Sequence, residues 1–212
     1  MGNPFMIDAV TVATLRIDRA EEHLAAIRTE IRNYLTTNPA EFGALDGPQP
    51  LEPTRIHHPP PARLVLLTGD CLSNIRNALE GMFWALSLET GPKDPDRERI
   101  VFPMFSNEAK YRAALPGIER NVSIEGLRVL EEVQPFRTRN PSLSVLRGLS
   151  NRNRYGLISF TVRGSTTHDH PSPASFVAFE VPHLLATTME SVLSRIVQHV
   201  RRDVIPKFEG WR

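Results

Sequence analysis

Hydrophobic residues recur every three to four positions in two long stretches of the chain, which is the spacing of one face of an α-helix. The first stretch, residues 8–36, has an apolar seam formed by Ile17, Ala20, Leu24, Ile27, Ile31 and Tyr34. The second, residues 61–89, has a broader stripe formed by Leu64, Leu67, Cys71, Ile75, Ala78, Leu79, Met82, Phe83 and Leu86. The seam predicts a helix packed within a bundle, and the broader stripe predicts the central helix of that bundle.

Shorter patterns predict further helices. Three are expected after the second long helix, at about residues 107–114, 123–133 and 143–154. Ser123 is the expected N-cap of the middle one, because a hydroxyl in that position accepts a hydrogen bond from a first-turn amide. A C-terminal helix over residues 183–204 is predicted by the apolar residues that line one of its faces: Leu184, Leu185, Met189, Val192, Ile196, Val197 and Val200.

Two stretches in residues 156–182 are rich in β-branched and aromatic side chains and predict a β-hairpin with a long tip, STTHDHPSP. Residues 38–60 are rich in proline and predict a loop or an extended connector. We therefore expect residues 1–212 to form one domain of mainly α class. Its bundle core spans residues 61–155, and the hairpin precedes the C-terminal helix.

Composition places the chain among ordinary globular proteins, with 41% hydrophobic and 23% charged residues. The formal net charge of +1 gives no whole-chain reason to bind nucleic acid. The single cysteine, Cys71, excludes an internal disulfide, and its place in an apolar stripe predicts a core residue rather than a nucleophile. No signal peptide and no apolar run of about 18 residues is present, so a cytoplasmic protein without membrane contact is expected.

No pattern predicts a metal or a cofactor, because the chain lacks a Gly-rich phosphate loop, a paired-Cys motif and a His-Glu-x-x-His helix. The nearest groupings are His57 and His58 in the connector, and His168, Asp169 and His170 at the hairpin tip. Both are expected to be solvent-exposed loop residues rather than metal ligands.

Charge is distributed unevenly along the chain. Residues 133–168 contain no acid, but they contain Arg137, Arg139, Arg147, Arg152, Arg154 and Arg163. These arginines either bind phosphate or pair with the acidic N-terminal helix, and the second interpretation is slightly favoured because the chain is nearly neutral. The segment NRNRYG, residues 151–156, adds two amides and the ring of Tyr155 to Arg152 and Arg154, a combination that suits RNA or a nucleotide.

The second long helix carries polar residues beside its apolar stripe. Asp70, Asn74, Asn77 and Gly81 follow one another at spacings of four, three and four, while Arg76 and Glu80 are four apart and can pair. One interpretation is a hydrogen-bond network of Asp70, Asn74 and Arg76 that fastens this helix to its neighbours. The other is a site for a ligand or partner. A glycine in mid-helix, Gly81, predicts a close approach of another segment.

The stretch GDCLSNIRNALEGMFWAL, residues 69–86, resembles the motif G-D-x-L-H-N-L-R-S-A-L-D-H-x-x-W-x-L of a widespread, largely uncharacterised group of bacterial and phage proteins. The later landmarks of that group are F-P-I, L-Q-P-Y and a segment ending in D-K-H-R. They are matched in order by residues 102–104, 133–136 and 149–156.

The motif helix is also similar to that of the HEPN superfamily, whose helical bundles often dimerise. Active members are metal-independent endoribonucleases, in which a histidine assists attack by the 2′-hydroxyl and an arginine stabilises the phosphorane. Others bind nucleotides or are non-catalytic. Arg76 and Asn77 match the first positions of the signature and are the catalytic residues that the resemblance implies, but Gly81 replaces its histidine. Ser73 and Tyr155 replace the group's two other histidines.

Three functions follow as hypotheses. The first is a non-catalytic binding or regulatory module of bacterial or phage stress or defence, such as a toxin–antitoxin system. It would be a homodimer that takes RNA, a nucleotide or a protein as partner, and its expected binding residues are Asp70, Asn74, Arg76, Asn77, Arg152, Arg154 and Tyr155. The second is an RNA-cleaving enzyme of toxin or defence type, and the third is a structural or assembly protein. The replaced histidines favour the first.

Overall fold

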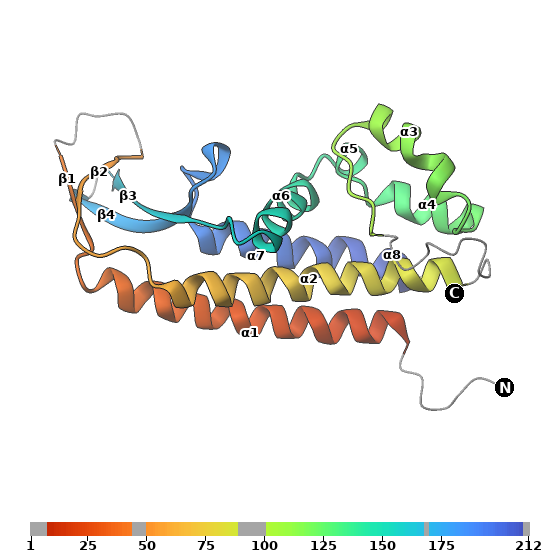
Figure 1. The fold of residues 1–212 in the computed structure, drawn as a ribbon, viewed down its shortest axis with the longest axis horizontal. Helices are drawn as coiled ribbons and strands as arrows, with labels where there is room; N and C mark the ends of the chain where they lie inside the picture. Colours follow the sequence, from red (N-terminus) through yellow and green to blue (C-terminus); the bar gives the residue numbers. More distant parts are fainter. Residues whose placement is uncertain (1–7, 44–49, 89–100, 168–169, 210–212) are drawn as a thin grey trace. The chain divides into compact units, whose positions relative to one another are not determined.

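The computed structural model describes residues 8–43, 50–88, 101–167 and 170–209 (Figure 1). It is mainly α-helical with a β-hairpin before the C-terminal helix, which confirms the fold class predicted from the hydrophobic pattern. The chain groups into two compact units. The first unit comprises residues 1–20, 72–151 and 196–212, and the second unit comprises residues 21–71 and 152–195. The predicted single domain over residues 1–212 stays a prediction.

The two long helices are α1, Ala9–Leu35, and α2, Ala62–Leu88. Asp8 caps α1 by accepting hydrogen bonds at Oδ1 from the amides of Val10 and Thr11. Every residue of the predicted α1 seam is buried, and so is the α2 stripe apart from Leu67, which is half-buried. Both apolar faces were therefore predicted correctly, because helical periodicity is a local property of the sequence.

In the first unit, α2 is followed by α3, Glu108–Ile118, and α4, Ile124–Glu132. The Oγ atom of Ser123 accepts the amide hydrogen bond of Gly126, which confirms the predicted cap of α4. A short helix that was not predicted, α5, covers Pro135–Thr138, and α6 covers Ser142–Arg154. An ion pair between Arg112 of α3 and Glu131 of α4, at 3.0 Å, links two of these helices.

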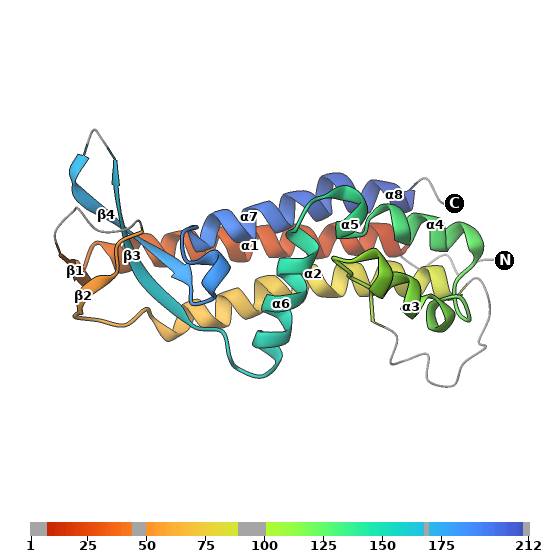
Figure 2. The same cartoon turned by 90° about the horizontal axis from the view of Figure 1, so that it is seen from above.

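In the second unit, the proline-rich connector contains two short strands, β1, Ala40–Phe42, and β2, Pro53–Ile56, which pair antiparallel. The hairpin consists of β3, Phe160–Thr167, and β4, His170–Phe179. Figures 1 and 2 show the two strand pairs side by side, and a bridge between Leu51 and Gly164 joins them.

The predicted long hairpin tip needs correction. Strand pairing continues to Thr167 and His170, so most of the residues that were predicted as a loop belong to the two strands. The abundance of Ser, Thr and Pro in this stretch suggested a loop, but antiparallel pairing satisfies the backbone groups there.

The C-terminal region also differs from the single helix predicted over residues 183–204. A 3-10 turn, η2, covers Pro182–Leu184, and the main helix, α7, covers Met189–His199. A π-helical turn, η3, then covers Val200–Val204, and α8 covers Ile205–Glu209. The apolar pattern identified the buried residues of α7 but not the widened turn, in which an extra residue is inserted into the helix. Within the described residues, no helix is both long and apolar enough to span a bilayer.

Candidate functional site

The residues predicted to form a site are divided between the two units. Asn74, Arg76 and Asn77 belong to the first unit, whereas Asp70 and the segment 152–155 belong to the second. Each group is therefore described within its own unit.

In the first unit, Arg76 pairs with Glu80 one helical turn later. The distance from Arg76 Nε to Glu80 Oε1 is 2.6 Å, and the two side chains are only 18% and 24% exposed. This confirms the pairing predicted from their spacing. Glu80 also accepts the backbone hydrogen bond of Phe102 at its second oxygen. Because Arg76 and Phe102 share one carboxylate, the arginine helps to hold Glu80 against the segment after α2.

That segment, residues 102–105, is held by three side chains from separate parts of the first unit. Gln134 is fully buried; its Nε2 donates to the Pro103 carbonyl at 3.0 Å and its Oε1 accepts from the Phe105 amide at 2.9 Å. Arg147 of α6 donates from Nη1 to the Met104 carbonyl at 2.6 Å. We call Glu80, Gln134 and Arg147 the latch. Since Phe102, Pro103 and Met104 are buried, their backbone polar groups need such partners.

The latch contacts fall in three of the four stretches on which the motif resemblance rests. The motif helix supplies Glu80, the segment 102–104 supplies the backbone groups, and the segment 133–136 supplies Gln134. Gln134 was not predicted as a site residue, and Arg147 was predicted only as one of the arginines of the basic segment. The available signal was a glutamine between apolar residues and followed by proline, which is an unusual place for a buried amide unless it has partners.

Gly81 does not have the close neighbour that was predicted for it. A Cβ atom built at Gly81 has no atom within 4 Å among the described residues, so the expected close approach is wrong. The glycine lies on a partly exposed part of α2, and Ser73 and Asn77 on this helix are exposed while Asn74 is half-buried. A side chain at position 81 is therefore sterically permitted.

The basic segment divides into paired and unpaired arginines. Arg137 pairs with Glu131 and Arg147 binds the Met104 carbonyl in the first unit, while Arg163 pairs with Glu52 in the second. Glu52 lies in the connector rather than in the N-terminal helix, so the predicted partner was wrong for Arg163. Arg152 and Arg154 are exposed, and neither forms an ion pair with any residue that the structure describes.

In the second unit, the end of α6 has a defined geometry. Gly156 adopts a left-handed backbone, with φ of +66°, and its amide donates to the Asn153 carbonyl. The Leu157 amide donates to the Arg152 carbonyl at 2.8 Å. This pair of bonds is a Schellman motif, which ends the helix and requires glycine at the left-handed position. The turn leaves Tyr155 72% exposed and Leu157 60% exposed.

Asn153 connects this turn to α2. Its Nδ2 donates a long hydrogen bond of 3.5 Å to the Gly69 carbonyl, and a Cβ at Gly69 would lie 2.8 Å from its Oδ1. The glycine of the G-D motif thus allows the side chain of Asn153 to approach the α2 backbone. Leu66, one turn before Gly69, is 69% exposed, and Asp70, directly after Gly69, is also exposed. The structure therefore brings Asp70 and the segment 152–155 onto adjoining elements.

Two further predictions concern metal ligands and Cys71. No group of three or more His, Cys, Asp or Glu side chains suited to a metal ion occurs in the described residues, and His168 and Asp169 lie outside them. His57 is exposed, as predicted, and lies 2.8 Å from Glu41. Cys71 is fully buried, and burial raises the pKa of its thiol to about 12. Its interpretation as a core residue is confirmed, because a buried neutral thiol is a poor nucleophile.

A buried histidine was also not predicted. His199 in the first unit has Nδ1 2.7 Å from Asp203 Oδ2 and 3.0 Å from Asn140 Nδ2. Its spacing of four from Asp203 was the available signal. The histidine is 4% exposed, so its ring is out of reach of a substrate, and its contacts tie the α7–η3 junction to the segment before α6.

Comparison with known proteins finds no match to a family model, to a curated protein sequence or to a solved structure. Functional residues therefore rest on the geometry of this chain and on the motif resemblance alone.

Proposed function

We propose that this chain is a non-catalytic, HEPN-like binding module that binds single-stranded RNA through the C-terminal end of α6. Two features support the non-catalytic part. Gly81 has no side chain to transfer a proton, and Arg76 is engaged by Glu80 at 2.6 Å. A general base or acid must reach the reacting proton, and a nuclease of the resembled type needs the arginine free for the phosphate.

The observation that carries the RNA-binding proposal is the exposed segment Arg152–Tyr155. Two arginines without ion pairs in the described structure shortly precede Tyr155, which is 72% exposed, at a turn fixed by Gly156 and Asn153. Arginine neutralises phosphates, and an exposed ring offers a stacking surface for an unpaired base. Exposure of Leu157 beside them extends the apolar part of the surface.

Fluorescence anisotropy with a labelled single-stranded RNA of mixed sequence tests this proposal. Replacing both Arg152 and Arg154 with Gln should weaken binding and reduce the slope of log affinity against log salt by about 2, roughly one for each phosphate that an arginine no longer neutralises. Tyr155→Ala should cost about 1–3 kcal/mol of binding free energy, while Tyr155→Phe should keep most of it.

A matched control removes the same charge from exposed positions elsewhere in the second unit. The double variant Arg32→Gln/Arg55→Gln should bind RNA as the wild type does, because these arginines lie on α1 and β2. Equal losses in both double variants would show a non-specific charge effect, and no RNA retention at low salt would contradict the proposal.

Incubation of the protein with mixed RNA in EDTA tests the nuclease alternative. The proposed module leaves the RNA intact, whereas cleavage that is abolished by Arg76→Ala would establish the enzyme. Gly81→His adds a further comparison, because a Cβ at position 81 meets no described atom within 4 Å. Cleavage by Gly81→His alone would show that the wild type lost activity through this position.

The resemblance supports two further parts of the proposal. The module is proposed to be a cytoplasmic homodimer with a role in bacterial or phage stress or defence, where a protein partner is a further candidate. Light scattering coupled to size-exclusion chromatography measures the oligomeric state directly. A monomer at all concentrations would remove the homodimer from the proposal and leave the RNA contact to be judged separately.

A further inference from the structure

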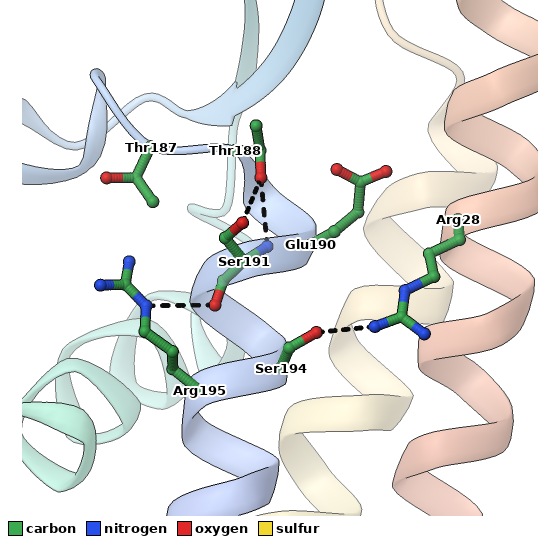
Figure 3. A pocket seen from close by; sticks show the side chains of 7 residues that line it. All are labelled: Arg28, Thr187, Thr188, Glu190, Ser191, Ser194 and Arg195. Carbon is green, nitrogen blue, oxygen red and sulfur yellow. Dashed lines mark hydrogen bonds between the residues drawn. The ribbon is translucent and has the colours of Figure 1, made fainter.

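We propose that a pocket along the N-terminal half of α7 binds a small sugar phosphate or nucleotide, a ligand distinct from the RNA assigned to α6. The pocket lies within the second unit, between α7 and Arg28 of α1, and has a volume of about 550 Å³ (Figure 3). This volume falls in the range of small-molecule sites, about 300–1,000 Å³, but the pocket is wide open to solvent, so a ligand there would stay partly exposed. Its walls combine two arginines, several hydroxyl groups and one carboxylate.

Among the described residues, each arginine of the pocket is held through one nitrogen, which leaves its other nitrogens for a ligand. Arg28 donates from Nη2 to Ser194 Oγ at 2.8 Å, and Arg195 donates from Nε to the Ser191 carbonyl at 3.2 Å. These bonds restrain the two side chains at the two edges of the face of α7 that lines the pocket, as Figure 3 shows. A restrained guanidinium loses less conformational entropy when it binds phosphate than a free one does.

The charges in the pocket do not neutralise one another. Glu190 lines the same pocket, yet among the described residues it forms no ion pair within 4.0 Å with Arg28 or Arg195. Two cations and one anion leave the pocket with a positive balance. An unpaired cation is available to a phosphate, and the separate carboxylate is available to accept hydrogen bonds from sugar hydroxyls.

The hydroxyl groups add donors to the pocket. Thr188 Oγ1 accepts from the Ser191 amide at 3.2 Å and donates to Ser191 Oγ at 2.8 Å. Ser191 Oγ and Ser194 Oγ each accept one hydrogen bond in this way and retain their own hydrogens for a ligand. The Ser191 amide already donates its hydrogen bond to Thr188 Oγ1. The anion contacts proposed here therefore come from side chains and not from this backbone group.

Isothermal titration of the full chain with ribose 5-phosphate, AMP, inorganic phosphate, ribose and adenosine tests the proposal. The two organic phosphates should bind with one-to-one stoichiometry, and ribose and adenosine should not bind. Arg28→Gln and Arg195→Gln should each weaken binding about tenfold or more, because each removes charge-assisted bonds. Both arginines are exposed, so circular dichroism should show an unchanged fold.

Arg32→Gln is the matched control, since Arg32 is an exposed arginine one turn further along α1 that does not line the pocket. It should bind ribose 5-phosphate as the wild type does. Glu190→Gln should strengthen the binding of inorganic phosphate by removing repulsion. It should weaken ribose 5-phosphate relative to inorganic phosphate, because a neutral amide oxygen accepts hydrogen bonds from sugar hydroxyls less strongly than a carboxylate does.

Three results would overturn the proposal: no organic phosphate binding at about 10 mM, beyond the millimolar range of weak specific ligands; an equal loss in Arg32→Gln; or displacement of bound ribose 5-phosphate by the single-stranded RNA. Displacement would assign the pocket to nucleic acid. The proposal of ligand binding at α7 can fail independently of the proposal of RNA binding at α6, because Arg28→Gln should leave RNA binding unchanged.

Discussion

At the scale of single residues, Gly164 and Gly81 have opposite surroundings. A Cβ at Gly164 would lie 2.9 Å from the Phe42 ring, whereas one at Gly81 meets nothing within 4 Å in the described structure. Gly164→Ala should therefore destabilise the protein by about 1–3 kcal/mol through overpacking. Gly81→Ala should stabilise it by up to about 1 kcal/mol through helix propensity. Urea unfolding measures both, and a reversed order would contradict the described packing.

Burial of Cys71 predicts a dependence of stability on pH. Its thiol pKa is raised from 9.0 to about 12 in the folded state, so the unfolded chain releases this proton first as the pH rises. The contribution of Cys71 is fully present below pH 9.0 and is lost as the pH rises toward about 12. The difference in free energy of unfolding between the wild type and Cys71→Ala should therefore shrink over this range. A constant difference would show that the thiol is not protected.

Residue contacts differ in how far the sequence can predict them. The Arg76–Glu80 pair and the cap at Ser123 depend on residues three or four positions apart, so local spacing was sufficient. Gln134 reaches Pro103 and Asn153 reaches Gly69 only after the chain has folded. Hydrophobic periodicity does not indicate which residues far apart in the sequence will contact each other.

At the scale of elements, mutation of Gln134 tests whether the latch holds the segment 102–105 in place. Gln134→Leu leaves the Pro103 carbonyl and the Phe105 amide without their buried partner. We expect a loss of about 1–3 kcal/mol of stability for each group left unsatisfied, and faster hydrogen exchange at Phe105. The exposed Gln198 of α7 is the control, because Gln198→Leu should change stability little. Equal stability of the two variants would contradict the latch.

Element boundaries show where composition misleads. The proline-rich connector contains β1 and β2, and the hydroxyl-rich hairpin tip continues the β3–β4 pairing. The connector was predicted as a loop or an extended segment and the hairpin tip as a loop, because such residues favour turns when only their neighbours in sequence are considered. Backbone pairing with another strand overrides that preference, and the partner strand is not visible in a local window.

At the scale of the whole molecule, the chain is expected to unfold in one transition. The helices α1, α2, α6 and α7 each contain residues of both compact units, so neither unit can lose these helices without affecting the other. Far-ultraviolet circular dichroism follows all helices, and tryptophan fluorescence, from Trp84 and Trp211, follows the first unit. The two curves should coincide in urea, as a single domain requires. Separate midpoints would show two independently stable units.

Fold class followed from the hydrophobic pattern, but function requires specific side chains. The net charge of +1 conceals Arg152 and Arg154, which have no ion pair in the described structure, and a pocket that gathers Arg28 and Arg195 from distant parts of the sequence. The first group was visible as a charge run. The second was not, because α1 and α7 come together only in the fold.

The open surroundings of Gly81 and the burial of Cys71 together make this protein suitable for site-specific labelling. Gly81→Cys would add one accessible thiol to a chain whose own cysteine is fully buried. A nitroxide attached there would report by pulsed electron paramagnetic resonance whether two copies of α2 approach each other. Quantification of the attached label would show whether the native thiol reacts as well.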